Sequence, residues 1–301
     1  MRKIIQKRKY TYLFSITLTI ASIIMLSMWG LNLGIDFKGG TLSEFRFAEG
    51  VQVDNQKIQE TLKDSNLNSL QIQKTGDRSY LLRYAASDEK TNSEVLEKLK
   101  KIDEKVEQAR VDFVGGSVSG QISKSAVKAL ILAIIGIALY IAWAFRKVYR
   151  PVSSWHYGLG AIIALAHDIL ITLGVFSFLG KFYGVEVGVP FIAALLTILG
   201  YSVNDTIVVY DRTRENLIRS SHKEDFEQIV NRSLNETLAR SINTSLTVII
   251  VLVAIVLFGG ESIKYFGIAL LVGIGFGTYS SIFVASALLV TSYKLAQKFR
   301  R

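Results

Sequence analysis

Six apolar stretches, each long enough or nearly long enough to cross a lipid bilayer, constrain the fold of this chain more than any other feature. A spanning helix needs about 20 mostly apolar residues, because each residue advances about 1.5 Å across a hydrocarbon core of about 30 Å. The sequence therefore predicts a polytopic α-helical membrane protein with six transmembrane helices. The predicted spans are residues 12–31, 126–145, 157–179, 189–210, 242–258 and 266–291.

Basic residues gather at the ends of these spans and predict their orientation. With six spans, all four basic clusters fall on one side, and the positive-inside rule assigns that side to the cytoplasm. We therefore expect a multi-pass protein of the cell inner (plasma) membrane with both termini cytoplasmic. The clusters are the N-terminal MRKIIQKRKY; Arg146, Lys147 and Arg150; Arg212, Arg214, Arg219 and Lys223; and Lys294, Lys298, Arg300 and Arg301.

The formal net charge of +10 could suggest a nucleic-acid partner, but its distribution indicates topology instead. The segment 32–124 holds 14 Lys and Arg against 15 Asp and Glu, so the basic excess lies on the rest of the chain. A charge imbalance at the ends of membrane spans is a topology signal. We therefore predict no nucleic-acid partner.

The segment 32–124 is patterned like a folded domain on the far side of the membrane. Strands are predicted at 41–47, 69–75, 79–85 and 109–114, where apolar residues alternate, and helices at 54–65 and 91–106. The order βαββαβ predicts a ferredoxin-like α+β domain. The predicted organisation is therefore three parts. They are residues 1–31, the outer domain 32–124, and residues 125–301 with a cytoplasmic, amphipathic loop helix at 223–240.

Glycines bracket the predicted outer domain, and two interpretations stay open: hinges for domain movement, or ordinary turns at the membrane junction. Asp36 and Lys38, within the segment GIDFKGG, could form a ligand site, although structure at the membrane interface is the favoured interpretation. The bracketing glycines are Gly34, Gly39 and Gly40 before the domain and Gly115 and Gly116 after it.

Asp205 is the strongest candidate for a proton site. It lies within the fourth span in LGYSVNDTIVVYDR, next to Asn204. A charge inside a spanning helix costs roughly 2.5–3.5 kcal/mol, so it needs a partner, a cavity or a function. A carboxyl group removed from water can exist in both protonation states near neutral pH, as a proton carrier requires. The alternative is a permanently paired structural ion.

Arg240 begins the fifth span at a similar depth and shares a helix face with Thr244. It could hold Asp205 ionised and release it on protonation, which would make the pair a two-state switch. The alternative is that the Arg240 side chain extends to the membrane surface.

Asp168 and His167 lie near the centre of the third span. Both a proton-coupled acid and a hydrogen-bonded structural aspartate fit Asp168, and the structural interpretation is preferred. A single histidine such as His167 is more often a satisfied interior residue than a ligand or a proton relay. In the sixth span, Gly273 and Gly277 have the GxxxG spacing of close helix packing, within this chain or against another.

The sequence contains no pattern that indicates a cofactor site or an enzyme active site. The chain has no cysteine and three scattered histidines, so it offers no metal-ligand spacing. Neither a nucleotide-binding glycine motif nor a HExxH or GxSxG motif occurs. We expect no cofactor, no metal site and no enzymatic activity.

Long motifs in order along nearly the whole chain resemble the SecF subunit family of the bacterial SecDF protein-export accessory, which is related to the RND transporters. In that family the acid of the fourth-span motif and the arginine of the following motif are implicated in proton use, and they fall on Asp205 and Arg240. One departure is Thr213, where the family usually has isoleucine. The motifs are GIDFKGGT, VGGSVS, ALAHDILITLGVFS, GYSVNDTIVVYDRTREN, NRSLNETLARSINTSLT and FGGESIKYFGIALLVGIGFGTYSSIFVAS.

The resemblance implies partners and a role. SecD would supply a second six-helix half, the SecYEG channel would associate with the pair, and YajC is a further candidate partner. The work would be late-stage preprotein translocation driven by proton entry, in contact with membrane lipid. Two alternatives stay open: an RND-like exporter half for lipid or small molecules, and a structural assembly factor. A self-sufficient RND exporter usually has a duplicated twelve-helix chain, and an assembly factor would tolerate Asp205→Asn.

Overall fold

The computed structural model describes residues 2–65, 67–146, 154–220 and 224–299. The chain divides into two compact units, which we name the bundle unit, Met1–Asn32 with Lys128–Arg301, and the sheet unit, Leu33–Val127. Within the described ranges, six helices are long and apolar enough to cross a membrane, so the predicted six-span fold class is confirmed. Lys147, Arg150, Lys223, Arg300 and Arg301, part of the predicted basic clusters, lie outside the described residues.

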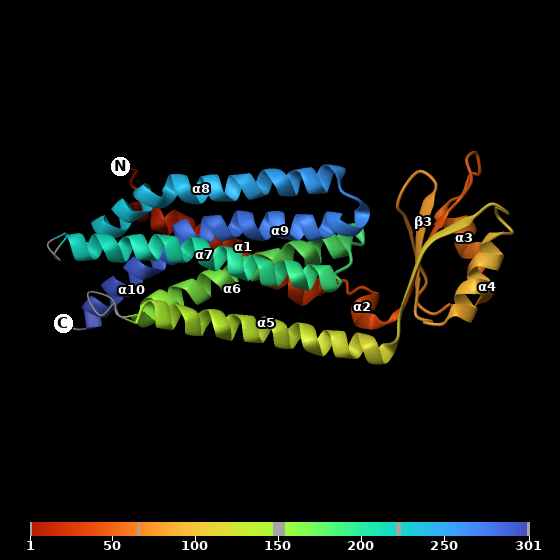
Figure 1. The fold of residues 1–301 in the computed structure, drawn as a ribbon, viewed down its shortest axis with the longest axis horizontal. Helices are drawn as coiled ribbons and strands as arrows, with labels where there is room; N and C mark the ends of the chain where they lie inside the picture. The colour runs from red at the N-terminus through yellow and green to blue at the C-terminus, as the bar shows by residue number, and fades with distance from the viewer. Residues whose placement is uncertain (1, 66, 147–153, 221–223, 300–301) are drawn as a thin grey trace. The chain divides into compact units, whose positions relative to one another are not determined.

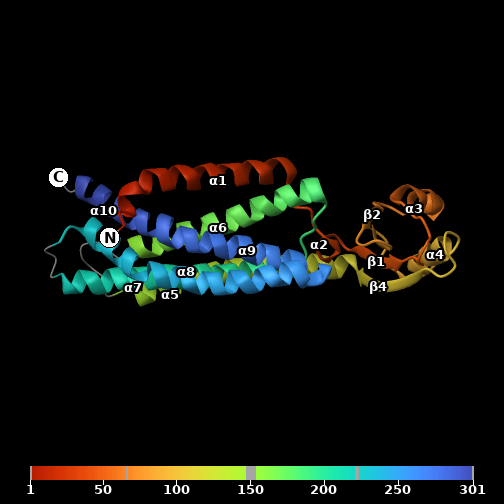
Figure 2. The ribbon, with the colours of Figure 1, turned by 90° about the horizontal axis from the view of Figure 1, so that it is seen from above.

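Long helices lie roughly alongside one another in the bundle unit (Figures 1 and 2). Three of them, α6, α7 and α9, are the most buried, and the other spans pack around them. Buried aliphatic and aromatic side chains fill the spaces between the helices. The elements are η1 (Ile5–Lys7), α1 (Arg8–Trp29), α5 (Gly116–Ala144, which begins in the sheet unit), α6 (Ser154–Tyr183), α7 (Val189–Arg219), α8 (Phe226–Phe258), α9 (Glu261–Ser280), η3 (Ser281–Ala285) and α10 (Ser286–Phe299).

The loop helix predicted at 223–240 is not a separate element, and this corrects the expected organisation. From Phe226 onward it is the first part of α8, which continues through the fifth span to Phe258. The segment contains no glycine or proline, so nothing in the sequence interrupts the helix. Its apolar stripe is buried in a core shared with Ile5 and Leu217.

The sixth span is interrupted where a single regular helix was expected. A π-helical turn, η3, separates α9 from α10, and Ser286 Oγ donates to the Ser281 carbonyl at 3.0 Å. The Tyr210 hydroxyl of α7 donates to the Ala285 carbonyl at 3.1 Å. Side chains thus bind carbonyl groups in and beside the irregular turn, which is necessary because a bilayer core offers no water to an unpaired backbone group.

The sheet unit has the predicted ferredoxin-like fold. Its four antiparallel strands have the order β2-β3-β1-β4, as two interleaved βαβ units require. Gly40 pairs with Val114, and Thr41 pairs with Tyr84. The elements are α2 (Ile35–Lys38), β1 (Gly40–Arg46), α3 (Asn55–Leu62), η2 (Lys63–Ser65), β2 (Gln71–Lys74), β3 (Ser79–Tyr84), α4 (Glu89–Leu99) and β4 (Glu107–Val114).

The helix predicted at residues 91–106 is α4, which ends at Leu99 rather than at residue 106. Asp103 explains the difference, because its carboxylate accepts hydrogen bonds from the backbone N–H of Ala48 at 2.7 Å and of Lys105 at 2.9 Å. Aspartate that binds nearby backbone groups competes with helix formation. The apolar residues after Leu99 therefore pack from a turn rather than from a helix.

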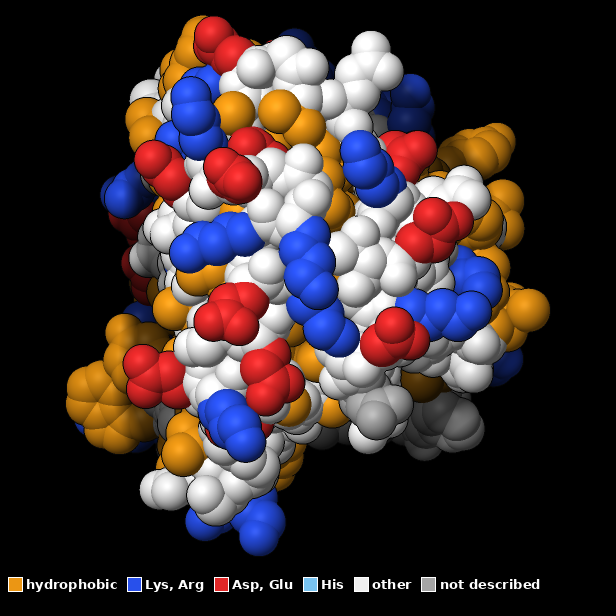
Figure 3. Space-filling model, turned by 90° about the vertical axis from the view of Figure 1, so that its right-hand side faces the viewer, with side chains coloured by type: hydrophobic (Ala, Val, Ile, Leu, Met, Phe, Trp, Pro, Cys, Tyr) orange, Lys and Arg blue, Asp and Glu red, His pale blue; other side chains and the backbone are white. Residues whose placement is uncertain are grey.

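Charged side chains of both signs are interspersed on the face of the sheet unit that Figure 3 shows. Figure 3 shows no large patch of one sign there. This surface fits the near-balanced charge of the segment and differs from the basic stripe typical of nucleic-acid binding.

Leu82→Ala should strongly destabilise the sheet unit. The Leu82 side chain is fully buried on β3, in a core with Phe45 and Tyr80. Removing a buried leucine side chain costs about 2–5 kcal/mol. Thermal unfolding of the segment 33–127 followed by circular dichroism measures the loss. Leu81→Ala on the other face of the same strand is the control, and an equal loss from both variants would contradict the assigned core.

Asp88 should make the stability of the sheet unit depend on acid pH. Asp88 caps α4, where Oδ1 accepts from the Thr91 N–H at 2.8 Å and Oδ2 from the Thr91 hydroxyl at 2.9 Å. These hydrogen bonds, the backbone bond first, hold the pKa of Asp88 below its ordinary value of 3.8. The ionised cap therefore stabilises the fold above pH 3.8, and this contribution is lost as the pH falls through the lowered pKa.

Asp88→Asn keeps a capping oxygen but cannot titrate in this range. The variant should lose less thermal stability between pH 6 and pH 3 than the wild type, by circular dichroism melts. Asp77→Asn, at an exposed turn position, is the control. An identical acid-induced loss in wild type and Asp88→Asn would contradict the assignment.

Candidate functional site

A cluster of polar side chains lies inside the bundle unit, where a membrane protein would otherwise be apolar. We define the buried polar cluster as eight residues contributed by α6, α7, α8, α9 and η3. Buried polar groups are costly unless they are hydrogen-bonded, so each contact in the cluster is informative. Its members are His167, Asp168, Ser202, Asp205, Thr206, Ser241, Ser280 and Ser281.

Asp168 joins three helices. The residue is fully buried, and its Oδ2 accepts hydrogen bonds from Ser202 Oγ of α7 at 2.6 Å and from Ser280 Oγ of α9 at 2.7 Å. Its Oδ1 lies 2.9 Å from His167 Nδ1. Both carboxylate oxygens therefore have partners, as the structural interpretation requires. The arrangement also holds α6, α7 and α9 in one register.

Ser202 and Ser281 continue the network toward the irregular turn of the sixth span. The Ser202 carbonyl accepts from Thr206 Oγ1 at 3.2 Å and from Ser281 Oγ at 3.3 Å. Thr206 Oγ1 and Ser281 Oγ are 2.7 Å apart. The π-helical turn is thus connected to α7, the helix that carries Asp205.

Asp205 is 8% exposed and has an incomplete set of partners. Its Oδ1 accepts a hydrogen bond from Ser241 Oγ of α8 at 2.6 Å. Its Oδ2 is buried and has no hydrogen-bond partner in the described part of the chain. An oxygen in this position can carry a proton or accept a further hydrogen bond. An ionised carboxylate that accepts only one hydrogen bond is poorly stabilised inside a membrane.

Arg240 does not pair with Asp205 in this structure. It lies on an exposed face of α8, and no ion pair joins the two side chains among the described residues. The next residue, Ser241, takes the position beside Asp205 instead. Each residue turns about 100° around an α-helix, so neighbours in sequence point to different sides. Pairing in another state stays a prediction.

His167 contacts Asp168 through Nδ1, while its Nε2 is buried and lacks a hydrogen-bond partner within the described ranges. The ring lies against Tyr279, with centroids 6.3 Å apart. The expected satisfied interior histidine is therefore only half satisfied.

Asn204 and Thr244, which the sequence places within the spans beside Asp205 and Arg240, lie outside the buried polar cluster. Both side chains are exposed on the bundle unit, and Thr244 Oγ1 donates to the Arg240 carbonyl of its own helix at 2.8 Å. The structure thus brings together Asp168 and Asp205 with serines, and leaves Asn204, Arg240 and Thr244 on outer faces. Within the described chain, no group of three or more His, Cys, Asp or Glu could hold a metal ion.

The two glycines of the GxxxG pattern pack inside this chain, against α7. A Cβ atom added at Gly273 would lie 2.2 Å from Ile198 Cδ1, and one at Gly277 would lie 3.0 Å from Ser202 Cβ. Small residues are therefore required for α9 to approach α7. This close approach also brings Ser280 within reach of Asp168.

Among the bracketing glycines, Gly39 and Gly40 have a clear conformational requirement. Their φ angles are +76° and +121°, and a Cβ atom at Gly40 would lie 2.5 Å from the Tyr84 carbonyl oxygen. These positions favour the turn interpretation. Gly34 precedes α2 in extended conformation, and Asp36 lies in the first turn of α2. Neither Gly115 nor Gly116 has a described neighbour that a Cβ atom would meet. Hinge motion stays a prediction.

The main partners that sequence reasoning missed are Ser241 and Ser280, each of which binds a buried aspartate. Serine is common in membrane spans, and its insertion costs little free energy. The cost of burial therefore identifies an acid as unusual but does not identify a serine. The usable signal was position, because Ser241 follows Arg240 and Ser280 lies one turn after Gly277.

The family comparisons cover most of the chain. Residues 94–295 match the family described as "Protein export membrane protein SecD/SecF, C-terminal", and residues 30–51 match the "SecD/SecF GG Motif". A "Protein translocase subunit SecF" of Thermobaculum terrenum is 43% identical over 303 residues, covering 97% of this chain and 94% of the relative. The corresponding protein of Sebaldella termitidis is 39% identical, covering 95% and 90%.

A solved structure shares the fold. The crystal structure of SecDF from Thermus thermophilus superposes with a TM-score of 0.83 at 33% identity, over 96% of this chain. This chain spans 38% of that SecDF chain. A SecDF structure in a super-membrane-facing form gives a TM-score of 0.70 over 99% of this chain. The matched family, the SecF relatives and the shared fold agree, and the chain therefore belongs to the SecD/SecF family of protein export membrane proteins, in its SecF branch.

Proposed function

We propose that this chain is the SecF half of a SecD–SecF assembly that uses the proton motive force to assist late-stage preprotein translocation through the SecYEG channel. Family membership supports the translocation role, because the SecF relatives are named translocase subunits. The solved SecDF chain is much longer than this chain and has the same fold over the matched part, which supports SecD as the missing half.

Proton use is assigned to Asp205, and one observation carries this assignment. Asp205 Oδ2 is buried without a partner in the described structure, while Oδ1 is held by Ser241. A proton on Oδ2 removes the charge that a bilayer interior disfavours. Loss of that proton leaves an anion that needs a new donor, and Arg240 on the same helix as Ser241 can supply it if α8 or the arginine side chain moves. Two protonation states thus favour two arrangements of α7 and α8.

The proposal is tested by preprotein export in cells depleted of the native subunit. The wild-type chain should restore export and the Asp205→Asn chain should not. An RND-like exporter of lipid or small molecules would leave preprotein export unaffected. A structural assembly factor would restore export equally well with Asp205→Asn.

We further propose that the chain lies in the inner membrane with both termini in the cytoplasm. Contacts support a common end for the termini, because Glu227 at the start of α8 binds Arg8 at 2.8 Å and also binds Lys294 of α10. Figure 1 shows the start of α1 and the end of α10 at one end of the bundle. The basic residues of the α7 end, Arg212 and Arg219, belong to the same predicted cytoplasmic side.

Impermeant thiol labelling of intact cells should distinguish the two sides. The chain contains no cysteine, so Asp77→Cys and Arg219→Cys can each be labelled without background. The Asp77→Cys chain should react in intact cells, and the Arg219→Cys chain should react only after permeabilisation. The reverse pattern would contradict the orientation.

A further inference from the structure

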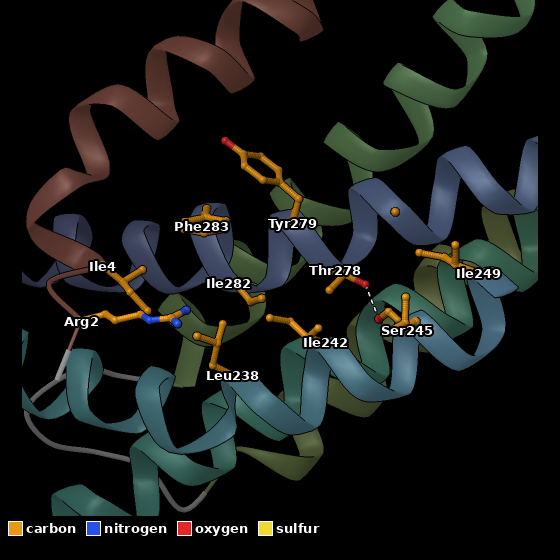
Figure 4. A pocket seen from close by; sticks show the side chains of 12 residues that line it. Arg2, Ile4, Leu238, Ile242, Ser245, Ile249, Thr278, Tyr279, Ile282 and Phe283 are labelled. Carbon is orange, nitrogen blue, oxygen red and sulfur yellow. Dashed lines mark hydrogen bonds between the residues drawn. The ribbon is translucent and has the colours of Figure 1, made fainter.

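A groove on the bundle unit lies between α8, α9 and the N-terminal segment, apart from the buried polar cluster. It has a volume of about 440 Å³, within the range of ligand sites, and aliphatic and aromatic side chains form most of its wall. Its three hydroxyl side chains already have partners, since Ser245 and Thr278 bind each other at 2.5 Å (Figure 4) and the Tyr279 hydroxyl donates to the Thr11 carbonyl at 3.1 Å. The wall therefore presents little unsatisfied polarity to an occupant.

A cation is held at one end of this groove. Figure 4 shows the Arg2 side chain entering between Ile4 and Leu238. The backbone of Arg2 is fixed by α8, since its N–H donates to Asn235 Oδ1 at 2.8 Å and its carbonyl accepts from Asn231 Nδ2 at 3.0 Å. The fold thus fixes the point from which this side chain extends.

The Arg2 guanidinium has no carboxylate partner in the described structure, whereas two other cations at this end of the bundle do. Arg8 and Lys294, at the same end of the bundle, both pair with Glu227. An arginine whose backbone is held in place and whose guanidinium has no acidic partner, at the end of an apolar groove, is complementary to an anion that carries a hydrocarbon chain.

The length of the groove fits one leaflet of a bilayer. From Leu238 at the Arg2 end to Ile249, its α8 wall covers about 16 Å at about 1.5 Å per residue. Half of a hydrocarbon core of about 30 Å is about 15 Å. An acyl chain that begins at the headgroup level beside Arg2 would therefore end near the centre of the membrane.

We propose that this groove binds one anionic phospholipid, with an acyl chain between α8 and α9 and the headgroup phosphate on Arg2. The binding does not depend on the role proposed for Asp205. The bound lipid would contact the start of the chain, α8 and α9. The packing of these segments would therefore depend on the lipid composition of the leaflet at the end where both termini lie.

Native mass spectrometry of the full-length chain tests the site, after incubation in detergent with equal amounts of phosphatidylglycerol and phosphatidylcholine of identical acyl chains. The wild type should retain phosphatidylglycerol preferentially. Arg2→Gln should reduce that preference roughly fivefold, as expected for one interfacial cation. Lys3→Gln, which removes an adjacent exposed charge outside the groove, should not. Equal preference in wild type and Arg2→Gln would overturn the proposal.

Blocking the apolar part gives an independent test. A Cβ atom at Gly275 meets no atom within 4 Å, so Gly275→Phe should fill the groove without disturbing the bundle and should remove bound lipid of both kinds. Gly136→Phe, at an equally open position on α5, is the control. Retention of lipid by Gly275→Phe would overturn the site. A photoreactive amino acid placed at Leu246 gives a further check in native membranes. Crosslinking to a protein helix instead of to phospholipid would also overturn the site.

Discussion

Asp205→Asn should abolish proton-dependent preprotein export while leaving the amount of protein in the membrane unchanged. Asparagine has nearly the shape of a protonated aspartate and can still accept from Ser241 through its amide oxygen, so the contact at 2.6 Å can persist. Removing an intramembrane charge relieves an insertion cost rather than adding one. The variant cannot release a proton, however, and stays in one arrangement. Export should fall to the level of the depleted strain.

Asp211→Asn is the matched control for this experiment. Asp211 lies on the same helix, is exposed, and pairs with Arg214 at 3.5 Å. It undergoes the same chemical change outside the buried polar cluster, and exposed ion pairs contribute little to stability. Export should therefore remain at the wild-type level. Full export by Asp205→Asn at normal abundance would favour a structural role for this acid and the assembly factor that the sequence left open.

Asp168→Leu should destabilise the helix bundle severely, whereas Asp168→Asn should be tolerated. Leucine leaves Ser202, Ser280 and His167 without their acceptor. Hydrogen bonds inside membrane proteins contribute roughly 0.6–1.7 kcal/mol each, so the loss of three amounts to about 2–5 kcal/mol. Asparagine keeps an acceptor oxygen for the serines. Thermal denaturation in detergent should therefore show a large fall in melting temperature for Asp168→Leu alone.

The comparison of the two Asp168 variants also separates the two interpretations of this acid. If Asp168 is structural, Asp168→Asn restores export in depleted cells, because the contacts between α6, α7 and α9 survive. If Asp168 carries a proton, Asp168→Asn is as inactive as Asp205→Asn although the protein is stable. Asp211→Leu is the control for Asp168→Leu, since it makes the same replacement on an exposed face.

The fold followed from the sequence wherever one physical signal dominated. Apolar length predicted all six spans, and alternation with turn residues predicted the βαββαβ order that identifies the ferredoxin-like fold of the sheet unit. Helix ends were predicted less well. The α7 helix continues to Arg219 and α5 begins at Gly116, because helix outside the apolar region carries no hydropathy signal. The π-helical turn Ser281–Ala285 has no signature that apolar patterning can detect.

The sequence predicted the two acids of the buried polar cluster but not which side chain lies beside Asp205. Burial cost selects Asp168 and Asp205 from sequence alone, since an acid in a bilayer needs a reason. Which side chain meets Asp205 depends on the rotation of α8, and a rotation of one residue exchanges Arg240 for Ser241. The depth of a residue in the membrane can be estimated from a sequence, but the rotation of one packed helix relative to its neighbour cannot.

Proton entry into proteoliposomes tests the central claim most directly. This chain is reconstituted with its SecD partner around an internal pH-sensitive dye, and a membrane potential is imposed. The wild type and Asp211→Asn should acidify the interior, while Asp205→Asn should match liposomes without protein. Acidification by Asp205→Asn at the wild-type rate would contradict the assignment of proton transfer to Asp205.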